Sequence, residues 1–448
     1  MKHRVGRNAV FNVAGVVLPT VVGIISVPIL LQNLGASRLG IFTLALGIIG
    51  FAGVFDLGLG RALTQSVATA TGQGRTLPTI ARHVRRTLPF VALMGVAWGA
   101  VLWLMAESIA LSVFRLEGDI AHEAALGVRW LAIAIPGLLL SSSLVGVLEG
   151  LQRFGLVNAL RIPLNAMTFV APVLTSFIWQ DVGQVIAALA IVRLIGVLIW
   201  ASALSSTLPM SHCADSEKLP AREMWRFTGW LSVTNIIGPL MVHADRFYLA
   251  ALFPPANVAY YTVPLDTLFR ATALPVAAIN ALFPALSDVG SGSDKAAHLV
   301  RTGALLMLAF WGVPILLASL TLDRLLALWL GVDFAAMSIN LSQWLLLAVL
   351  INGFAYLPYT LLQSDGRADL TAKLHLIELP IYAVALIILV GRFGVLGAAI
   401  AWTGRITLDA ALLYWLAYYR FPKAQSSLVL ASTLVAGAAL GFWILHLK

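Results

Sequence analysis

Long apolar stretches separated by short polar connections recur along the whole chain. About 20 apolar residues suffice for a helix to cross a hydrocarbon core of roughly 30 Å. By this measure the pattern predicts an all-α integral membrane protein. Its thirteen predicted spans cover residues 9–31, 39–60, 87–106, 126–148, 156–178, 184–206, 228–252, 258–286, 299–320, 341–363, 374–391, 395–418 and 427–446.

The first span follows Lys2, Arg4 and Arg7, as the apolar core of a secretory signal peptide would. The run is too long for a signal peptide, and many similar runs follow it, so we predict a first transmembrane helix. We expect twelve core helices and one or two further helices at the C-terminus, with 427–446 as the first of these.

The composition agrees with a membrane protein. Of the 448 residues, 60% are hydrophobic and 11% are charged, so a soluble fold would expose large apolar patches. Cys213 is the only cysteine, which excludes an intrachain disulfide. The sequence contains no phosphate-binding loop and no metal-ligand spacing, so we expect no cofactor, no bound metal and no catalytic residues. The net charge of +9 reflects basic connections rather than a nucleic-acid partner.

Basic residues divide unevenly between the two sets of connections. Of the 29 Lys and Arg residues, nineteen fall on the side of the N-terminus and five on the other side. Arg61 and Arg161 are counted among the nineteen. Cytoplasmic connections are enriched in Lys and Arg, so we predict a cytoplasmic N-terminus and a cytoplasmic link containing Cys213.

A weak internal repeat divides the chain into halves. LGASRLGIF (34–42) matches FPPANVAYY (253–261), GLQRFGLVNAL (150–160) matches SDGRADLTAKL (364–374), and VGQVIAALA (182–190) matches FGVLGAAIA (393–401). Each half holds six spans, so we predict two bundles related by a pseudo-two-fold axis along the membrane normal. The expected domains are a bundle at 1–206, a cytoplasmic linker at 207–227, a bundle at 228–420 and an additional helix at 421–448.

Apart from the residues counted with the connections, five basic residues lie within spans, where a charge at the bilayer centre costs about 2.5–3.5 kcal/mol or more. They are Arg129, Arg193, Arg246, Arg270 and Arg405. Arg193 has no acid in its own span, so it needs a partner on another helix or a ligand. We predict that it faces a central cavity between the two halves, with Arg405, its counterpart in the repeat, opposite.

Structural roles are the alternative for the other cations. Asp409 follows Arg405 by four residues, and Asp266 precedes Arg270 by four, so each pair could form an ion pair within one helix. Arg129 lies near the outer end of its span and is expected to reach the lipid headgroups.

Other polar or small residues within the spans have weaker patterns. The acids that could pair with Arg193 across helices, or titrate as coupling acids, are Asp245, Asp266, Glu378 and Asp409. His243 and His375 could relay protons, although a lone histidine is a weak signal. Gly146 and Gly150 form a GxxxG pattern, which is typical of close helix packing.

The segment PILLQNLGASRLGIFTLALGIIGFAGVFDLGLGRALTQSVA (28–68) resembles the opening of the bacterial polysaccharide transporter family. DRFYLAALFPPANVAYYTVPLDTLFRA (245–271) is similar to the seventh and eighth helices of that family, and ALFPALSD (281–288) to the end of its eighth. The family belongs to the multidrug/oligosaccharidyl-lipid/polysaccharide exporter superfamily, and it includes flippases for O-antigen and other lipid-linked oligosaccharides.

The resemblance implies two six-helix bundles around a V-shaped central cavity and alternating access without an enzymatic reaction. The implied cargo is an undecaprenyl-diphosphate-linked unit of O-antigen, capsule or exopolysaccharide. A cationic cavity would bind it, and the candidate cations are Arg61, Arg193, Arg246, Arg270 and Arg405. Lipid II flippases have an arginine in the first helix, but no charge lies between Asn8 and Leu31 here, which argues against lipid II.

Two other functions stay open at this point. One is a cation-coupled multidrug or small-solute antiporter of the same superfamily, whose cavity should be dominated by buried acids. The other is a polysaccharide polymerase or ligase, which would need catalytic side chains on a large outer loop. The longest outer loop, 107–125, contains Glu117, Asp119, His122 and Glu123 but no catalytic arrangement.

The expected location is the bacterial inner membrane. We expect the protein to act as a monomer on a lipid-linked oligosaccharide, in contact with membrane lipids. A polysaccharide polymerase and its chain-length machinery are candidate protein partners.

Overall fold

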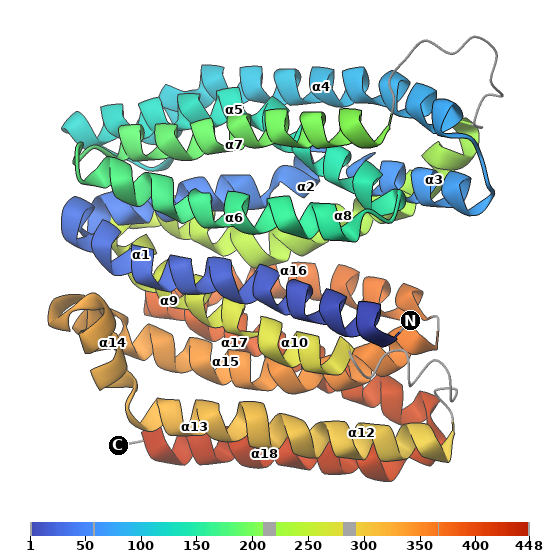
Figure 1. The fold of residues 1–448 in the computed structure, drawn as a ribbon. Coiled ribbons are helices and arrows are strands. Elements are labelled where there is room, and N and C mark those ends of the chain that lie inside the picture. Colours follow the sequence, from blue (N-terminus) through green and yellow to red (C-terminus); the bar gives the residue numbers. More distant parts are fainter. Residues whose placement is uncertain (1, 57–58, 209–220, 281–292, 366, 447–448) are drawn as a thin grey trace. The chain divides into compact units, whose positions relative to one another are not determined.

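The computed structural model describes residues 2–56, 59–208, 221–280, 293–365 and 367–446, and these residues are mostly helical (Figure 1). Ten of the described helical segments are long and apolar enough to cross a membrane. Lipid offers no hydrogen-bond partners to the backbone. A helix pairs its own N–H and C=O groups, so helices suit an apolar chain within a membrane. The chain is a multi-pass, all-helical membrane protein. Cys213 and the end of the eighth predicted span lie outside the described residues.

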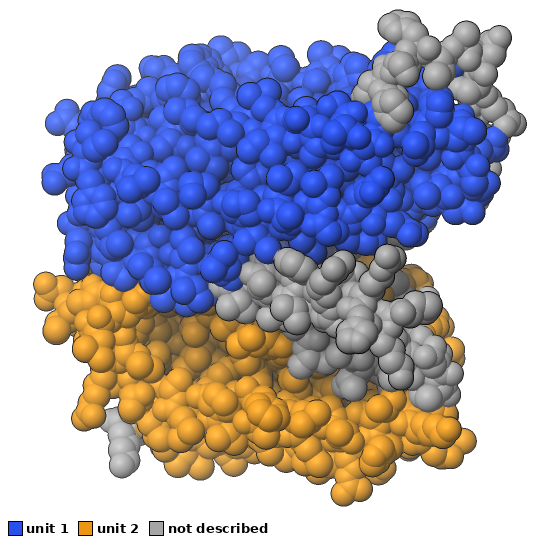
Figure 2. All heavy atoms as spheres, viewed as in Figure 1, with its two compact units in different colours: residues 1–259 blue, residues 260–448 orange. Residues whose placement is uncertain are grey.

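The helices form two compact units, residues 1–259 (unit 1) and 260–448 (unit 2), which Figure 2 colours separately. The division falls within the helix Pro255–Ala271, whereas the sequence places the join between halves at 207–227. Helix α8 (Ala221–Leu252) packs on the first three helices and therefore belongs to unit 1. The predicted extents of the two six-helix bundles stay a prediction.

Unit 1 contains eight helices before the division, among the residues described. They are α1 (Lys2–Gly50), α2 (Ala52–Phe55), α3 (Leu59–Gly72), α4 (Leu77–Ser108), α5 (Gly118–Gly150), α6 (Phe154–Ser176), α7 (Val182–Thr207) and α8. The first two predicted spans share α1, which breaks at Gly35 with φ 77° and ψ 168°. This positive φ suits glycine, and it falls at the predicted outer turn.

Unit 2 follows the same pattern of long helices and short connections. Its described helices are α9 (Pro255–Ala271), α10 (Ala273–Asn280), α12 (Asp294–Met307), α13 (Val313–Leu320), α14 (Leu322–Leu330), α15 (Val332–Ser364), α16 (Ala368–Phe393), α17 (Val395–Arg420) and α18 (Gln425–His446). A π-helical turn joins α12 to α13, so the two make one candidate span. Helix α18 matches the last predicted span and is also a candidate span.

One helix is the packing centre of each unit. The most apolar window of α5 is 67% buried and that of α15 is 83% buried, against 28% for α6 and for α16. Helix α5 packs on α3, α4 and α7, and α15 packs on α14 and α17. These two central helices hold equivalent places in the sequence repeat, so the helix at the packing centre is repeated as well.

The GxxxG pattern on α5 brings that helix against α3. A Cβ atom at Gly146 would overlap the hydroxyl of Thr64, and one at Gly150 would lie 2.8 Å from the carbonyl oxygen of Thr64. The prediction of close packing is therefore confirmed, and it fixes the α5 backbone next to the start of α3.

An ion pair ties three helices of unit 1 together. Nε and Nη2 of Arg38 donate to the two carboxylate oxygens of Glu123 at 2.7 and 2.6 Å. The same carboxylate accepts the backbone N–H of Val182, the first residue of α7, at 3.1 Å. With three hydrogen bonds, this carboxylate joins the second part of α1 to α5 and α7.

Candidate functional site

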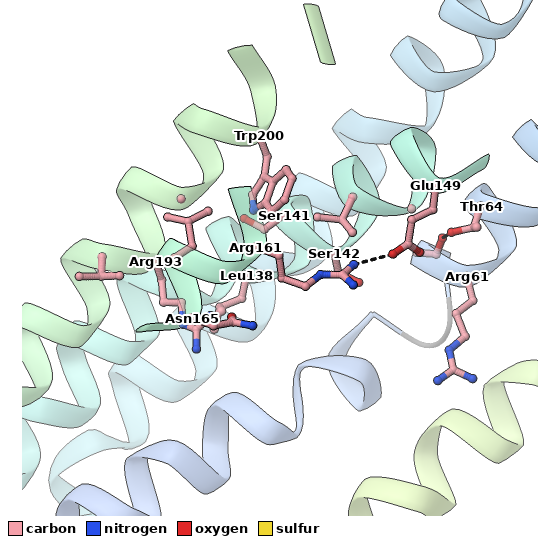
Figure 3. Close-up of a pocket in the computed structure, with 16 residues that line it drawn as sticks. Arg61, Thr64, Leu138, Ser141, Ser142, Glu149, Arg161, Asn165, Arg193 and Trp200 are labelled. Carbon is pink, nitrogen blue, oxygen red and sulfur yellow. Dashed lines mark hydrogen bonds and ion pairs between the residues drawn. The ribbon is translucent and has the colours of Figure 1, made fainter. Parts of the chain in front are cut away.

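A cavity of about 400 Å³ lies inside unit 1, between α3, α5, α6 and α7 (Figure 3). Its volume is in the range of small-molecule pockets. Polar and apolar side chains line it together, namely Gly60, Arg61, Thr64, Leu138, Ser141, Ser142, Val145, Gly146, Glu149, Arg161, Leu164, Asn165, Val192, Arg193, Gly196 and Trp200. A cavity of this kind can hold a charged ligand with hydroxyl and aromatic groups around it.

The α5 wall follows from helical periodicity. Ser141, Ser142, Val145 and Glu149 recur at the spacing that places residues on one face of a helix. The packing of Gly146 on α3 sets how far this face stands from Arg61. The helical spacing therefore decides which α5 side chains point into the cavity, and the contact at Gly146 decides how close they lie to α3.

Arginines outnumber acids in the cavity lining. The lining contains three arginines, Arg61, Arg161 and Arg193, and one acid, Glu149. Nη2 of Arg161 donates to Oε1 of Glu149 at 2.5 Å. Arg61 and Arg193 make no hydrogen bond or ion pair with any residue that the structure describes. The lining thus has an excess of positive charge.

Arg193 lies near the middle of α7. The helix begins at the N-cap Asp181, whose side chain accepts the N–H of Gly183 at 2.6 Å. At 1.5 Å per residue, Arg193 is about 16 Å along this helix. Its Nε is buried without a hydrogen-bond partner among the described residues, and its side chain lies beside Asn165 in Figure 3. A guanidinium at this depth requires water or an anion to compensate its charge.

Two charged residues of the cavity were not singled out from the sequence. Arg161 was assigned to the cytoplasmic connections, but it lies two turns inside α6 and lines the cavity. Glu149 was not considered, because it stands at the end of α5 where exposed acids are common. The pair is separated by 12 residues across the α5–α6 connection, a spacing that indicates no contact by itself.

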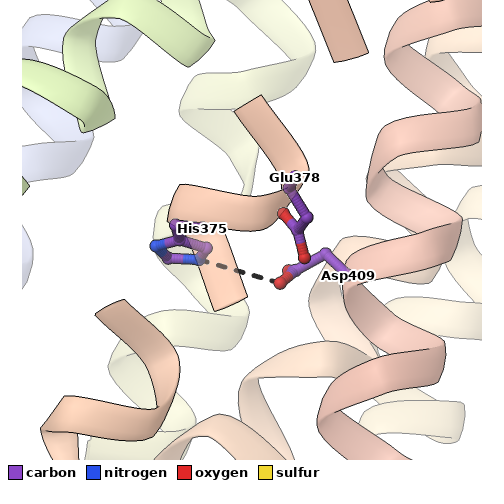
Figure 4. Close-up of side chains that lie close together, drawn as sticks. All are labelled: His375, Glu378 and Asp409. Atoms are coloured by element: carbon purple, nitrogen blue, oxygen red, sulfur yellow. Dashed lines mark ion pairs between the residues drawn. The ribbon is translucent and has the colours of Figure 1, made fainter. Parts of the chain in front are cut away.

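A second polar cluster lies in unit 2, on α16 and α17 (Figure 4). Ligand atoms of His375, Glu378 and Asp409 lie within 4.8 Å of one another, and Nε2 of His375 is 3.7 Å from Oδ1 of Asp409. Glu378 is 1% exposed, and neither of its oxygens accepts a hydrogen bond from a described residue. Two carboxylates this close repel each other when both are charged, so a proton or a cation between them would stabilise the cluster.

Arg405 lies on α17 beside this cluster but forms no ion pair with a described residue. Its Cζ atom stands 5.8 Å from the ring centre of Tyr382, and its Nε is buried without a hydrogen bond. The alternative in which Asp409 neutralises Arg405 is not seen, because the ion pair of Asp409 is with His375. Tyr382 supplies a cation–π contact instead.

The remaining predicted cations occupy other surroundings. Arg246 is 1% exposed within unit 1, where its Nη1 donates to the carbonyl oxygen of Thr43 at 3.4 Å. The adjacent Asp245 is fully buried and accepts the backbone N–H of Arg246 at 2.7 Å. Neither residue lines the cavity of unit 1. Asp266 and Arg270 are half-buried on α9 in unit 2.

Two further expectations concern single residues. Arg129 donates to Glu107 of α4 at 2.5 Å and lies 5.9 Å from the ring of Trp103, so a protein carboxylate neutralises it. His243 packs edge-on against Phe51, with ring centres 5.8 Å apart. Neither residue lines the cavity.

Comparisons with known proteins agree with this fold. A profile of the MatE family matches residues 13–168. A Shigella flexneri protein named "Putative O-antigen transporter" is 29% identical over 411 residues, which are 92% of this chain and 97% of that protein. The chain belongs to the multidrug/oligosaccharidyl-lipid/polysaccharide exporter superfamily. A Haloferax volcanii member, "Probable low-salt glycan biosynthesis flippase Agl15", is 22% identical over 92% of this chain and 84% of its own length.

Solved structures of the superfamily have the same fold. An inward-facing multidrug resistance MATE transporter matches with a TM-score of 0.71 at 15% identity, over 93% of this chain and 98% of the other. The lipid II flippase MurJ, in an inward closed conformation, matches with a TM-score of 0.69 at 11% identity, over 97% of both chains. The membership makes this protein a transporter and not an enzyme, as the sequence predicts.

Proposed function

We propose that this superfamily member is a flippase for an anionic, polyprenyl-linked oligosaccharide. It would move an undecaprenyl-diphosphate-linked unit of O-antigen, capsule or exopolysaccharide from the cytoplasmic to the outer leaflet by alternating access. The names of the Shigella and Haloferax relatives support a glycan cargo for this chain as well. The cargo would carry its charge in a diphosphate and, in many glycans, in acidic sugars.

The excess of arginine in the cavity of unit 1 is the observation that carries this proposal. Arg61 and Arg193 are available to a ligand, since neither is paired among the described residues. Guanidinium groups bind phosphate oxygens through short, often bidentate hydrogen bonds. Ser141, Ser142 and Trp200 add hydroxyl and aromatic groups next to these cations, which suits a sugar attached to a phosphate.

The acids of unit 2 support coupling to an ion gradient. Glu378 and Asp409 lie together with His375 at the depth of the membrane, where a proton or cation would compensate their charge. The sequence has no phosphate-binding loop for ATP. In this proposal unit 1 binds the cargo and unit 2 binds the coupling ion. Asp245 and Asp266 stay candidate coupling acids.

The proposed location is the bacterial inner membrane with the N-terminus in the cytoplasm. The asymmetry of Lys and Arg supports this orientation. A monomer would present the cargo to a polysaccharide polymerase and its chain-length machinery on the outer side.

Reconstitution tests the function directly. Proteoliposomes containing the purified protein would be loaded with a fluorescent undecaprenyl-diphosphate oligosaccharide, and its transfer between leaflets would be followed by quenching from outside. We expect transfer to respond to an imposed ion gradient and not to added ATP. A cationic dye serves as the comparison substrate. Transport of the dye without transfer of the glycan lipid would replace this function by that of a multidrug antiporter.

A further inference from the structure

The pair of Arg161 and Glu149 differs from the pair of Arg38 and Glu123, which links helices of unit 1. At Arg38, the carboxylate of Glu123 takes part in three hydrogen bonds, and the side chains of Arg38 and Glu123 are 30% and 11% exposed. Arg161 and Glu149 share one hydrogen bond, and their side chains are 39% and 31% exposed. A single contact that water can reach is exchanged at much lower cost than a buried, bidentate one.

The pair also lies where a ligand would bind. Both side chains line the cavity of unit 1, and Glu149 is the single acid among the residues described there. Figure 3 shows the two side chains directed toward each other across the cavity wall. Any anion that enters the cavity therefore competes with this carboxylate for the guanidinium of Arg161.

We infer that Glu149 is the resident counter-anion of Arg161, which the phosphate oxygens of the cargo displace on binding. This inference rests on the proposed binding of an anionic cargo in the cavity. Arg61 and Arg193 attract the anion first, because they have no competing partner among the described residues. Arg161 then changes partner from the carboxylate to the phosphate.

The displaced carboxylate has two effects on transport. It lowers the affinity of the empty cavity for weakly bound anions, since they must compete with Glu149. It also returns to Arg161 when the cargo leaves, which favours release. A transporter needs both properties, because an anion held by three unopposed arginines would dissociate slowly.

Binding of inorganic pyrophosphate to the full-length protein in nanodiscs tests this role. Isothermal titration calorimetry would compare the wild type with Glu149→Gln, which keeps the shape of the side chain and removes its charge. We expect Glu149→Gln to bind pyrophosphate more tightly, by about tenfold, the size of one charge-assisted hydrogen bond. Glu149→Asp, whose shorter carboxylate should hold Arg161 less well, should lie between the two and covers the case in which Glu149→Gln folds poorly.

Glu107→Gln is the matched control. Glu107 pairs with Arg129 at the same 2.5 Å distance but does not line the cavity, so its loss should leave pyrophosphate binding unchanged. In an Arg161→Ala background, Glu149→Gln should gain much less than tenfold, because its effect acts through Arg161. A purely structural role for Glu149 predicts weaker binding instead of tighter binding.

The outcomes separate this inference from the proposed function. If Arg193→Ala and Arg161→Ala weaken binding while Glu149→Gln binds no more tightly than the wild type, the counter-anion role is wrong and the anion site stands. If pyrophosphate binding is undetectable in every variant, or unaffected by the loss of Arg193 and Arg161, the anion site and this inference both fail.

Discussion

The two polar sites, one in each unit, are built from different charged side chains. In unit 1, three arginines and one glutamate surround a cavity, and two of the arginines have no partner among the described residues. In unit 2, two carboxylates and a histidine lie within 4.8 Å of one another, and Arg405 stands beside them against a tyrosine ring. Both sets sit on helices with the same order of long apolar segments. In the function proposed above, a repeated scaffold would thus support an anion site in one half and a cation site in the other.

Arg193 and Arg405 show how this difference arises. They hold near-equivalent places in the repeat, yet Arg193 faces a cavity and Arg405 lies over Tyr382. The neighbouring helix contributes Asn165 to the cavity in the first case, and Tyr382 and Glu378 in the second. The position of a charge along a helix is therefore not enough to define its function, because its partners come from other helices.

The strongest test of the comparison is the loss of Arg193. Arg193→Ala should abolish glycan export and weaken pyrophosphate binding by about 10- to 100-fold, the size of a charge-assisted hydrogen bond to a buried cation. Arg193→Lys should retain part of the activity, since the charge remains without the planar fork, and Arg193→Glu should be the least active. Export would be measured in cells that lack their own flippase.

Arg129→Ala is the control for this experiment, because Arg129 is already neutralised by Glu107 outside the cavity. It should leave export close to the wild-type level. Normal export by well-expressed Arg193→Ala would show that the cavity of unit 1 does not bind the cargo.

The acids of unit 2 should control coupling and not cargo binding. Glu378→Gln removes a buried carboxylate from the cluster, so export should lose its response to an imposed pH gradient. A single coupled proton gives about tenfold accumulation per pH unit, which sets the size of the loss. Pyrophosphate binding should not change. The measurement is glycan transfer in proteoliposomes at several gradients.

Asp333→Asn is the matched control in unit 2. Asp333 lies exposed in the first turn of α15, away from the cluster. Export could still respond to the pH gradient in Glu378→Gln, in Asp409→Asn and in the double variant. Coupling would then depend on other groups.

Replacing Arg405 should have a smaller effect than replacing Arg193. A cation–π contact is worth roughly 0.5–1 kcal/mol at exposed sites and more when desolvated, so Arg405→Ala should lower export about two- to fivefold. The same export assay measures both variants side by side. Equal losses for Arg193→Ala and Arg405→Ala would mean that both cations bind the cargo, and the contrast between the units would not hold.

A fourth variant separates stability from function. Arg38→Met breaks the ion pair with the largely buried Glu123, and the free energy of unfolding should fall by about 2–3 kcal/mol. The melting temperature in detergent, followed by tryptophan fluorescence, would report this. Adding Glu123→Gln should recover part of the loss. Arg367→Met, which breaks an exposed pair with Asp369, should leave the melting temperature unchanged.

Several features of the fold were readable without coordinates. The predicted spans fall mostly on helices where the structure describes them, and the outer turn near Gly35 appears as a break in α1. Ten described helical segments qualify as membrane spans; the first two predicted spans share one of them, and the predicted spans 228–252 and 258–286 are not among the ten. The GxxxG pattern at Gly146 and Gly150 correctly indicated close packing. The repeat placed α5 and α15 at equivalent positions, and both are packing centres.

The candidate site was only partly readable. Arg193 was selected because a cation within a span needs an explanation, and Arg61 was named as a further candidate cation; both line the cavity of unit 1. Arg161 was assigned to a connection, and Glu149 had no distinguishing pattern. His375 was a weak candidate until the structure placed it beside Asp409 on a different helix.

By itself, the sequence determined the solvent of this protein, its helices and their order. Lipid offers no hydrogen bonds, so an apolar stretch of sufficient length has to be a helix, and a charge within it stands out. Only the tertiary structure decided which charges meet. A helix places every third or fourth residue on one face, but the neighbouring helix decides whether that face meets Asn165, Tyr382 or a carboxylate. That choice depends on contacts such as the one between Gly146 and Thr64, where a single added methyl group would change the spacing.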